Sequence, residues 1–333
     1  MAVFKVAVTD SVFPNLDTER AILAREGAEI AASQCRSVAD AVALVQGAHA
    51  LLNGYFKPVG PEVMDAMPDC RIIVRYGIGL DSVDIPAATA RGIAVANVPD
   101  YCIAEVSDHA VAMTLSLLRK LPLSDRRVRA GDWDLKPIAP LKRLSTLTAG
   151  IVGMGRIGRM IAAKLEPFGF RIVFHDPFFT GEPPVPSAQA VGLEELFAES
   201  DAIILQTPLT ADTKHMLNDA AFAAMGRRPV IVNCARGELI DTAALVRALE
   251  TGHISGAGLD VIESAPPLAV NHPLMQCDNV ILAPHSAWMS TTALTDLQRL
   301  AAEEVARALR GERPKVLANP EVWPQVRWKQ PAT

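Results

Sequence analysis

Three polar residues in the second half of the chain follow apolar runs and carry groups suited to anion binding and proton transfer. Arg236 closes the run Asn233-Cys-Ala-Arg, where a guanidinium could hold a carboxylate through two hydrogen bonds. Asp260 ends a nearly apolar stretch, where a carboxylate needs a partner. His285 is of the residue type that exchanges protons near neutral pH. The ordinary alternatives are a surface ion pair for Arg236 and a structural role for His285.

A glycine motif lies upstream of these residues and predicts a dinucleotide site. Gly153, Gly155 and Gly158 form G-x-G-x-x-G directly after the apolar run 148–152. The first glycine permits a sharp turn, the second lets backbone approach a pyrophosphate, and the third lets the next helix pack closely. The following apolar run ends at Asp176, an acid placed to hold ribose hydroxyls, with no cation close behind it. We therefore expect NAD as the cofactor, and a glycine-rich turn of another α/β protein is the alternative.

Other candidate binding residues also follow predicted strands, at the edge where open parallel sheets bind ligands. Tyr76-Gly77-Ile78-Gly79 comes after the apolar run 71–75, and its glycines suit a loop whose backbone amides face a ligand. An ordinary turn is the alternative there. The predicted cofactor-binding residues are Gly153, Gly155, Arg156, Ile157, Gly158, Asp176, Thr207, Pro208, Cys234, Ala235, Arg236, Asp260 and His285.

Short apolar runs alternate with helical patterns along the chain, which predicts parallel sheets covered by helices on both faces. In the first half we expect strands at residues 3–8, 48–53, 71–75 and 93–96, and helices at 18–26 and 61–67. In the second half we expect one six-stranded sheet, from residues 149–153, 171–175, 201–206, 230–234, 256–261 and 280–283. Between these elements we expect a helix at 102–121 ended by Pro122, an irregular arm at 124–144, a surface loop at 177–189 and a closing helix at about 290–310.

The closing helix is expected to return to the first domain, so that the nucleotide domain is inserted into a split substrate domain. The predicted fold class is α/β, with two Rossmann-like doubly wound parallel-sheet domains. The substrate domain, which is flavodoxin-like, takes residues 1–100 and 287–333, and the NAD-binding domain takes residues 101–286. The arm could pack against a second subunit.

Composition narrows the class of protein. The 333 residues are 50% hydrophobic and 21% charged, which is typical of a globular chain with room for two domains. The net charge of −5 and the lack of a basic run argue against nucleic acid as a partner. No apolar run has transmembrane length, and the N-terminus is predicted to be a strand and not a signal peptide. The five scattered cysteines predict a reduced, cytoplasmic setting and no metal site.

Taken together, the motifs resemble the D-isomer-specific 2-hydroxyacid dehydrogenases over roughly residues 3–320. The glycine motif with Asp176, the run Asn233-Cys-Ala-Arg-Gly237, the strand Gly258-Leu-Asp-Val261 and Pro284-His285 fall in that family's order and spacing. Within the family, two segments are most similar to the branch of the C-terminal-binding protein corepressors and their bacterial relatives. They are Asn97-Val-Pro-Asp-Tyr-Cys102 and Pro284-His-Ser-Ala-Trp288.

The resemblance implies NAD-dependent hydride transfer between a D-2-hydroxy acid and its 2-oxo acid, in a homodimer formed through the nucleotide domains. It implies that Arg236 and His285 are catalytic: Arg236 binds the substrate carboxylate and orients the carbonyl, and His285 is the acid–base residue. Asp260 would contact the nicotinamide, and Trp288 would line an apolar substrate pocket. The implied substrate-binding residues are Tyr76, Gly77, Ile78, Gly79, Tyr101 and Trp288.

One position departs from the family's pattern Asp-Val-x-Glu-x-Glu-Pro, whose second glutamate hydrogen-bonds the catalytic histidine. This chain reads Asp260-Val-Ile-Glu-Ser-Ala-Pro266, so Ala265 occupies that position and Glu263 matches the first glutamate. Three interpretations stay open. His285 could act without that partner, with Glu263 or a substrate group nearby. The chemistry could need less proton transfer, as in the related formate dehydrogenases. Alternatively, the protein could be an NAD(H)-binding sensor, a corepressor-like scaffold or a non-standard NAD-using enzyme.

Overall fold

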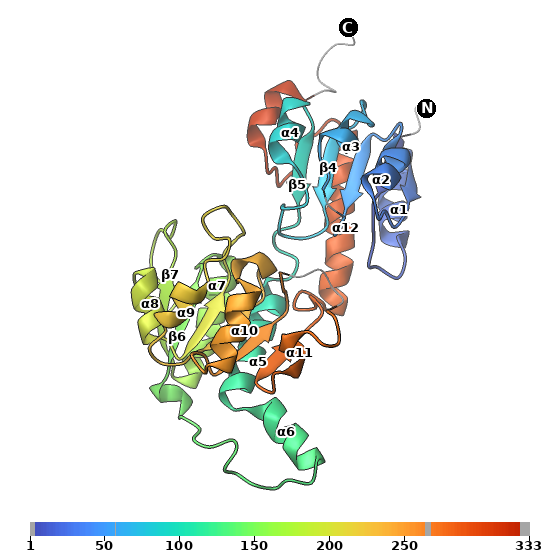
Figure 1. Ribbon diagram of the computed structural model, residues 1–333. Helices are drawn as coiled ribbons and strands as arrows, with labels where there is room; N and C mark the ends of the chain where they lie inside the picture. Colours follow the sequence, from blue (N-terminus) through green and yellow to red (C-terminus); the bar gives the residue numbers. More distant parts are fainter. Residues whose placement is uncertain (1–3, 57, 264–267, 327–333) are drawn as a thin grey trace. The chain divides into compact units, whose positions relative to one another are not determined.

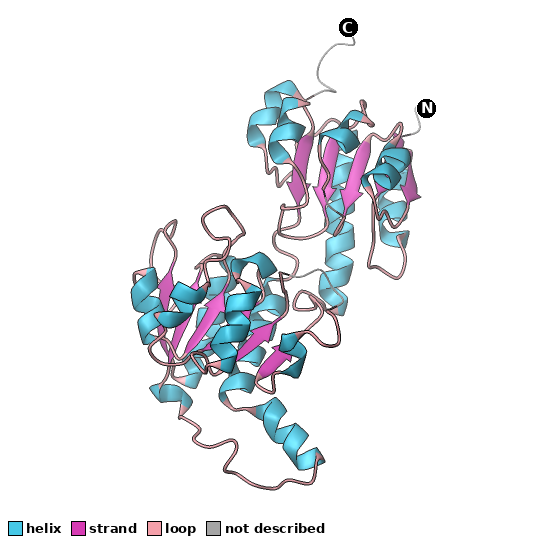
Figure 2. Ribbon diagram, viewed as in Figure 1, coloured by secondary structure: helices cyan, strands magenta, loops and turns pink. Residues whose placement is uncertain are grey.

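The computed structural model describes residues 4–56, 58–263 and 268–326, and the chain divides into two compact units. The first unit comprises Met1–Cys102 and Ser290–Thr333, and the second comprises Ile103–Met289 (Figure 1). In each unit the strands form one parallel sheet with helices on both faces (Figure 2). The fold is therefore α/β with two doubly wound units, and one unit is inserted in the sequence of the other.

The five-stranded sheet of the first unit has the order β2-β1-β3-β4-β5. Its strands are β1 (Phe4–Val8), β2 (Ala28–Ala32), β3 (Ala50–Asn53), β4 (Ile72–Arg75) and β5 (Ala94–Asn97). All the pairings are parallel, and β1 pairs with both β2 and β3. The strand order thus reverses beside β1, as in flavodoxin-like folds.

Helices cover both faces of this sheet. One face carries α2 (Val38–Val45), α3 (Pro61–Asp65) and α4 (Ile85–Ala90), whose apolar side chains form a core with Ala7, Leu51 and Ile73. The other face carries α1 (Asp17–Leu23) and the long α12 (Thr291–Leu309), which pack against each other. The predicted closing helix is confirmed as α12, which begins after Ser290, whose hydroxyl accepts from the amide of Ala293 at 2.9 Å.

The seven-stranded sheet of the second unit has the order β12-β11-β10-β9-β6-β7-β8, and all its pairings are parallel. Its strands are β6 (Thr148–Val152), β7 (Arg171–His175), β8 (Ala188–Ala190), β9 (Ala202–Leu205), β10 (Val230–Asn233), β11 (Gly256–Leu259) and β12 (Val280–Leu282). Its helices are α5 (Ile103–Leu118), α6 (Leu121–Arg129), α7 (Arg156–Leu165), α8 (Leu193–Glu199), α9 (Asp219–Ala223), α10 (Thr242–Glu250) and α11 (Pro273–Gln276). The order reverses between β6 and β9, the switch point at which Rossmann folds bind dinucleotides.

The apolar runs of this sheet are continuous because both of its faces are buried. Ala202 and Ile204 join the core shared with α5 and α7, whereas Ile203 and Leu205 join the core shared with α8 to α10. Successive side chains of a strand point to opposite faces, so a central strand such as β9 is apolar at each position. The predicted strand at 171–175 is confirmed as β7.

Several elements differ from the sequence-based expectation. The structure adds β2, α2 and α4 to the first unit, and it adds β8 as a seventh strand where a loop was predicted. β2 and β8 lack β-branched runs, so their patterns were weak. The arm begins as the regular helix α6, and Pro122 lies in the first turn of this helix, a position at which proline needs no amide hydrogen. Proline therefore starts a helix here, where it was expected to end one.

Candidate functional site

The glycine motif joins β6 to α7, and its glycines meet different surroundings. Gly153 has a φ of +95°, and a Cβ there would lie 2.5 Å from the carbonyl oxygen of Gln206. A Cβ on Gly158 would lie 2.1 Å from the carbonyl oxygen of Gly153. A Cβ on Gly155 would have nothing within 4 Å. Two glycines thus allow close packing, and Gly155 leaves backbone open at the N-terminus of α7, where a phosphate could approach.

Asp176 lies directly after β7 and faces the glycine motif. Its Oδ2 accepts from the amide of Met154 at 2.8 Å, and its Oδ1 accepts from the amide of Phe178 at 2.9 Å. A carboxylate oxygen can accept more than one hydrogen bond, so both oxygens can also receive ribose hydroxyls. Arg156 and Ile157 are the first residues of α7; Arg156 is exposed and Ile157 packs on the core.

The loop after β9 supplies an unused donor beside Gly153. The side-chain amide nitrogen of Gln206 is buried and has no hydrogen-bond partner among the described residues. Thr207 and Pro208 follow, and the Pro208 carbonyl accepts from the hydroxyl of Thr213 at 2.7 Å. A buried donor without an acceptor is costly, and a polar ligand at this edge would satisfy it. The open Gly155, Asp176 and Gln206 together fit a dinucleotide.

The turn after β10 is fixed by a buried asparagine. Asn233 donates through its side-chain nitrogen to the carbonyl of Arg236 at 2.8 Å, and its Oδ1 accepts from the amide of Ala235 at 3.0 Å. Next to Arg236, a Cβ on Gly237 would lie 2.1 Å from the carbonyl carbon of Ile262. The half-buried Arg236 therefore starts from a rigid turn, which suits a guanidinium that must meet a carboxylate in one geometry.

Cys234 belongs to the same turn. Burial raises the pKa of the Cys234 thiol, and the nearby charge of Asp260 raises it further. The thiol is therefore neutral in the physiological range. Because the thiolate is the reactive form of cysteine, Cys234 is suited to shape the site and not to act as a nucleophile.

Asp260 fixes the loop that carries His285. Its carboxylate is buried, with Oδ1 accepting from the amide of Ser286 at 2.7 Å and Oδ2 from the amide of Ala287 at 3.0 Å. The amide of His285 donates to the Asp260 carbonyl at 2.9 Å, and His285 has a φ of +55°. These contacts explain why the buried carboxylate is tolerated and hold His285 in a sparsely populated backbone conformation. The predicted contact of Asp260 with nicotinamide stays a prediction.

His109, which the sequence analysis left without a role, also faces Asp260. It lies on α5, and its Nε2 is 3.8 Å from Oδ1 of Asp260. That nitrogen is buried and has no hydrogen-bond partner among the described residues. The sequence carries no signal that singles out His109, because the same helix has other polar residues, such as Ser107 and Thr114, at buried positions.

Glu263, considered above as a support for His285, contacts another histidine. Its Oε1 lies 2.5 Å from Nε2 of His215, and its Oε2 accepts from the amide of Thr242 at 3.4 Å. No role for His215 was expected from the sequence. Support of His285 by Glu263 stays a prediction, and Ala265 lies outside the residues that the structure describes.

The loop of the first unit follows β4 and is held through its carbonyl oxygens. Gly77 has a φ of +131°, and its carbonyl accepts from the amide of Val98 at 3.1 Å. The Ile78 carbonyl accepts from the side chain of Asn97 at 2.6 Å. No hydrogen bond from the amides of Ile78 and Gly79 is found within the described residues. These two amides are therefore available to an anion.

The two tyrosines predicted to bind substrate differ in setting. Tyr76 is 5% exposed, and its hydroxyl donates to Glu19 at 2.8 Å, so its ring points into the first unit and reaches a ligand at most by its edge. Tyr101 follows β5, and burial raises the pKa of its hydroxyl, which is therefore neutral. Trp288 is buried three residues after His285.

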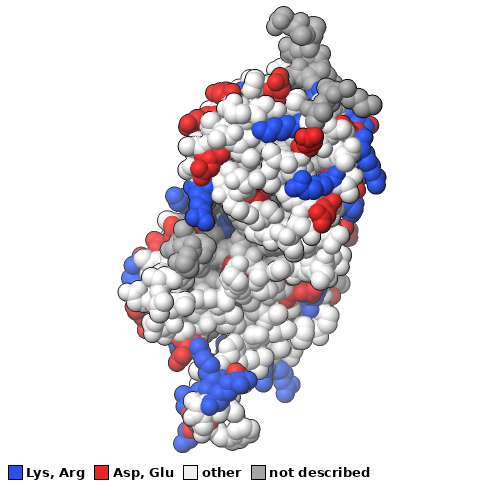
Figure 3. Space-filling model, turned by 90° about the vertical axis from the view of Figure 1, so that its right-hand side faces the viewer, with Lys and Arg blue, Asp and Glu red and all other residues white. Residues whose placement is uncertain are grey.

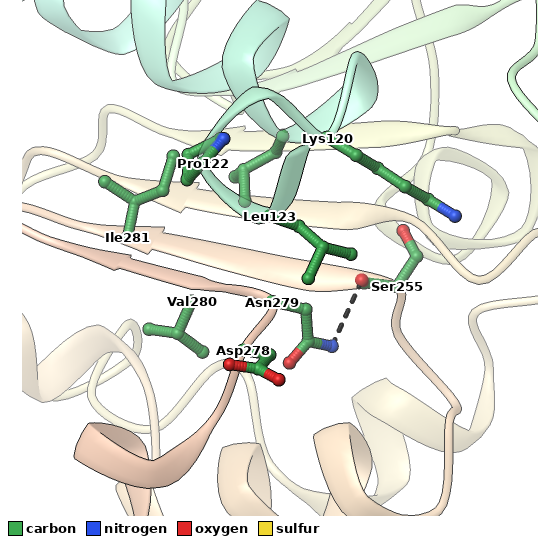
Figure 4. A pocket seen from close by; sticks show the side chains of 9 residues that line it. Lys120, Pro122, Leu123, Ser255, Asp278, Asn279, Val280 and Ile281 are labelled. Carbon is green, nitrogen blue, oxygen red and sulfur yellow. Dashed lines mark hydrogen bonds between the residues drawn. The ribbon is translucent and has the colours of Figure 1, made fainter. Parts of the chain in front are cut away.

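Two other features of the second unit lie away from these loops. A pocket lies at the amino ends of β11 and β12, opposite the edge that carries His285, so we assign it no part in the chemistry (Figure 4). It is lined by Leu117, Lys120, Pro122, Leu123, Ser255, Asp278, Asn279, Val280 and Ile281.

Basic side chains gather at the lower end of Figure 3, the height at which Figure 1 shows α6. Each arginine in the last turn of α6 has an acidic partner: Arg126 with Asp278, Arg127 with Asp132 and Arg129 with Asp125.

Within the described residues, no group of three or more His, Cys, Asp or Glu side chains could hold a metal ion. A search of the same residues finds no helix that combines the length and the apolar character needed to cross a membrane.

The structure brings the predicted cofactor-binding residues and the two predicted catalytic residues to the carboxyl edge of the seven-stranded sheet. Tyr76 to Gly79 and Tyr101 follow strands of the other sheet.

Comparison with known proteins gives consistent matches. Residues 111–287 match the family described as D-isomer specific 2-hydroxyacid dehydrogenase, NAD binding domain. The chain is 38% identical over 270 residues to glyoxylate reductase of Thermofilum pendens, covering 79% of each chain. The structure is similar to a glyoxylate reductase from Paecilomyes thermophila, with a TM-score of 0.86, 27% identity and coverage of 96% and 99% of the two chains. It is also similar to Aquifex aeolicus D-lactate dehydrogenase complexed with NAD and lactic acid, with a TM-score of 0.85, 25% identity and coverage of 94% and 98%.

Proposed function

Because the chain belongs to the family of D-isomer specific 2-hydroxyacid dehydrogenases, we propose that it reduces a small 2-oxo acid to the D-2-hydroxy acid with NADH, and runs the reverse oxidation with NAD. The protein is an oxidoreductase that uses NAD. The substrate class and the roles of individual residues are our proposal. Relatives named glyoxylate reductase support a small substrate.

The observation that carries the proposal is the fixed loop around His285. The backbone of His285 has a left-handed conformation and is held by Asp260 through the two following amides, so the side chain starts from a fixed point of the site. General acid–base catalysis needs such a group within reach of the atom that gains or loses the proton. In this account His285 donates a proton to the carbonyl oxygen during reduction and accepts it during oxidation.

Arg236 is the proposed anchor for the substrate carboxylate. Its turn is fixed by Asn233, and a guanidinium can bind a carboxylate through two parallel hydrogen bonds. The same positive charge stabilises the negative charge that develops on the carbonyl oxygen. NADH, when bound, supplies the hydride that the carbonyl carbon receives.

Further residues complete the proposed substrate and cofactor contacts. In the first unit, the amides of Ile78 and Gly79 bind the substrate carboxylate. In the second unit, Trp288 offers an apolar surface to the substrate side chain, and Asp176 holds the adenosine ribose. We place Tyr101 with the substrate because it follows β5 at the same sheet edge as Gly79.

We also propose a homodimer formed through the nucleotide domain. Four large apolar side chains on α6 and the segment that follows it are 45% to 88% exposed, and a group of exposed apolar side chains is typical of a surface that a partner covers. They are Leu121, Val128, Trp133 and Leu135. The molar mass in solution tests the assembly.

The cytoplasm is the compartment we propose, because the five cysteines are free thiols in the structure.

The test of function is turnover of NADH with a panel of 2-oxo acids that includes glyoxylate, pyruvate and hydroxypyruvate. We expect NADH loss with at least one of them; the product of pyruvate or hydroxypyruvate should be the D-enantiomer, whereas glycolate, the product of glyoxylate, has no stereocentre. NADH binding without turnover of any panel member would contradict the proposal. It would favour the sensor or scaffold interpretation that the alanine at position 265 raised.

A further inference from the structure

A fully buried carboxyl group in the first unit has no part in the site described so far. Glu19 lies on α1 and is 0% exposed. Its Oε1 accepts from the hydroxyl of Tyr76 at 2.8 Å, and its Oε2 accepts from the side-chain nitrogen of Gln298 at 2.9 Å. Gln298 lies on α12 and also donates to the carbonyl of Asn15 at 2.9 Å. Glu19 thus links two helices to one tyrosine.

Tyr76 is the first residue of the loop after β4, Tyr76 to Gly79, which is called the substrate loop from here on. Tyr76 follows β4 directly, its amide donates to the carbonyl of Asn53 at 2.8 Å, and its ring packs edge-on against Phe13 at 5.0 Å between centroids. The next residue is Gly77, whose φ of +131° lets the chain turn sharply. The amides of Ile78 and Gly79 follow at once. The position of Tyr76 therefore determines the position of these two amides.

Burial of Glu19 is costly, so its presence needs a reason. Burial raises the pKa of the Glu19 carboxyl group, and the hydrogen bond from Tyr76 is the largest opposing effect. An apolar side chain of similar size would avoid this cost. What the carboxyl group adds is a directional bond to the Tyr76 hydroxyl, which an apolar residue could not make.

A second buried glutamate of the same unit provides a comparison. Glu304 lies on α12 and is 6% exposed, and burial raises the pKa of its carboxyl group as well. Its Oε2 accepts from the amide of Lys315 at 2.8 Å, which ties the following segment to the helix. Glu304 therefore has a local structural role, whereas the bond of Glu19 leads to the substrate loop.

We propose that Glu19 is a positioning residue for the substrate carboxylate, and that it acts through Tyr76 on the direction of the Ile78 and Gly79 amides. This inference rests on the proposed function. Without the bond to Glu19, the Tyr76 ring can shift, and the loop then samples positions in which the amides do not converge on an anion. Substrate binding weakens, while proton transfer from His285 on the second unit is unaffected.

The experiment compares Tyr76→Phe, Glu19→Gln and the double variant in steady-state kinetics with the best 2-oxo acid. Each single change removes or weakens the same buried hydrogen bond. We expect KM for the 2-oxo acid to rise about tenfold, with kcat within about twofold and the Kd for NADH unchanged. The double variant should match the single variants, because both changes break one link. Glu304→Gln is the matched control and should leave KM unchanged.

An unchanged KM in Tyr76→Phe overturns the inference, and this variant loses only a hydroxyl, so it stays informative if Glu19→Gln does not fold. Multiplied effects in the double variant, or an equal rise of KM in Glu304→Gln, also overturn it. Absence of any turnover by the unaltered protein contradicts the proposed function and this inference with it. Turnover by the unaltered protein with unchanged variants contradicts the inference alone.

Discussion

Each of the two sheets carries its candidate loops at its own carboxyl edge. The two sets of loops differ in how closely main chain packs around them. In the second unit, Asn233 and Asp260 hold two of the loops by side-chain hydrogen bonds, and main chain also packs closely against main chain. A Cβ on Gly153, Gly158 or Gly237 would lie 2.1 to 2.5 Å from backbone atoms of a neighbouring segment. In the first unit, buried polar side chains hold the loops. Asp10 accepts from the amides of Gly54 at 3.0 Å and Tyr55 at 2.5 Å.

Other side chains extend this network in the first unit. Asn53 donates to the hydroxyl of Thr9 at 3.0 Å and accepts from the hydroxyl of Ser82 at 2.8 Å. Adding a side chain where main chain packs against main chain causes a large loss of stability, because the neighbouring backbone cannot move aside. Loss of one side-chain hydrogen bond lowers the free energy of unfolding by about 1 kcal/mol. The contrast teaches that a side chain added at a close-packed glycine of the second unit should act steeply, whereas loss of one side-chain hydrogen bond in either unit should act by a small step.

The largest expected effect is that of Arg236→Ala, which removes the proposed anchor and the charge beside the carbonyl. We expect kcat/KM for the 2-oxo acid to fall on the order of a thousandfold, the size seen when one stabilising donor is removed. NADH binding should stay nearly intact, since the glycine motif is unchanged. Arg236→Lys should recover little, because an ammonium cannot reproduce the two-pronged contact. Near-normal kcat/KM in the alanine variant would refute the carboxylate role.

The second prediction concerns the choice between NADH and NADPH. A 2′-phosphate would meet the carboxylate of Asp176, and Pro177, Phe178 and Phe179 after it offer no cation. Like charges this close should lower NADPH affinity on the order of a hundredfold. Titration of the protein with each dinucleotide measures the two dissociation constants. Equal constants would remove Asp176 from the proposed ribose site.

A third prediction separates two glycines of one motif. Gly158→Ala places a Cβ 2.1 Å from the Gly153 carbonyl, so α7 must move away from β6. We expect a loss of about 1–3 kcal/mol in the free energy of unfolding and weaker NADH binding. Gly155→Ala is the matched control, because a Cβ there meets nothing within 4 Å. It should keep the stability of the unaltered protein, so equal destabilisation of both variants would contradict the packing account.

The smallest expected effect concerns Ala265, which lies outside the described residues. A carboxylate at this position of the family's pattern supports the protonated histidine. Ala265→Glu should therefore raise kcat/KM for 2-oxo acid reduction roughly tenfold at neutral to mildly alkaline pH, within what general acid catalysis supplies. It should also move the alkaline limb of the pH–rate profile upward. An unchanged profile would mean that another group, such as Glu263 or the substrate, already supports His285.

The residues that could be found from sequence alone are those whose type and strand position are both informative. The glycine motif, Asp176, Arg236 and His285 each follow an apolar run, so the sheet edge that carries them was predictable. The role of Glu19 was not, because its partners Tyr76 and Gln298 are 57 and 279 residues away in the chain. Contacts of that separation depend on the tertiary fold and leave no local pattern.

The missed elements have a similar cause. β8 is three residues long and is defined by its pairing with β7, so nothing in its own sequence demanded a strand. The helix α2 did carry a local signal, because Ser37 and Asp40 form a capping box at its start. Asp260 was predicted as a binding residue, and Asn233 was only part of the run that ends at Arg236. The hydrogen bonds of both to the loops beside them depend on the tertiary fold and could not be predicted.

The most direct test of the central claim is transfer of a label from the cofactor to the substrate. The unaltered protein is incubated with a 2-oxo acid and NADH dideuterated at the nicotinamide C4, and the product is analysed by mass spectrometry and chiral separation. The account predicts a 2-hydroxy acid that carries one deuterium on C2, with the D configuration wherever C2 bears a carbon side chain. A product without deuterium, or NADH binding with no product from any 2-oxo acid, would contradict it.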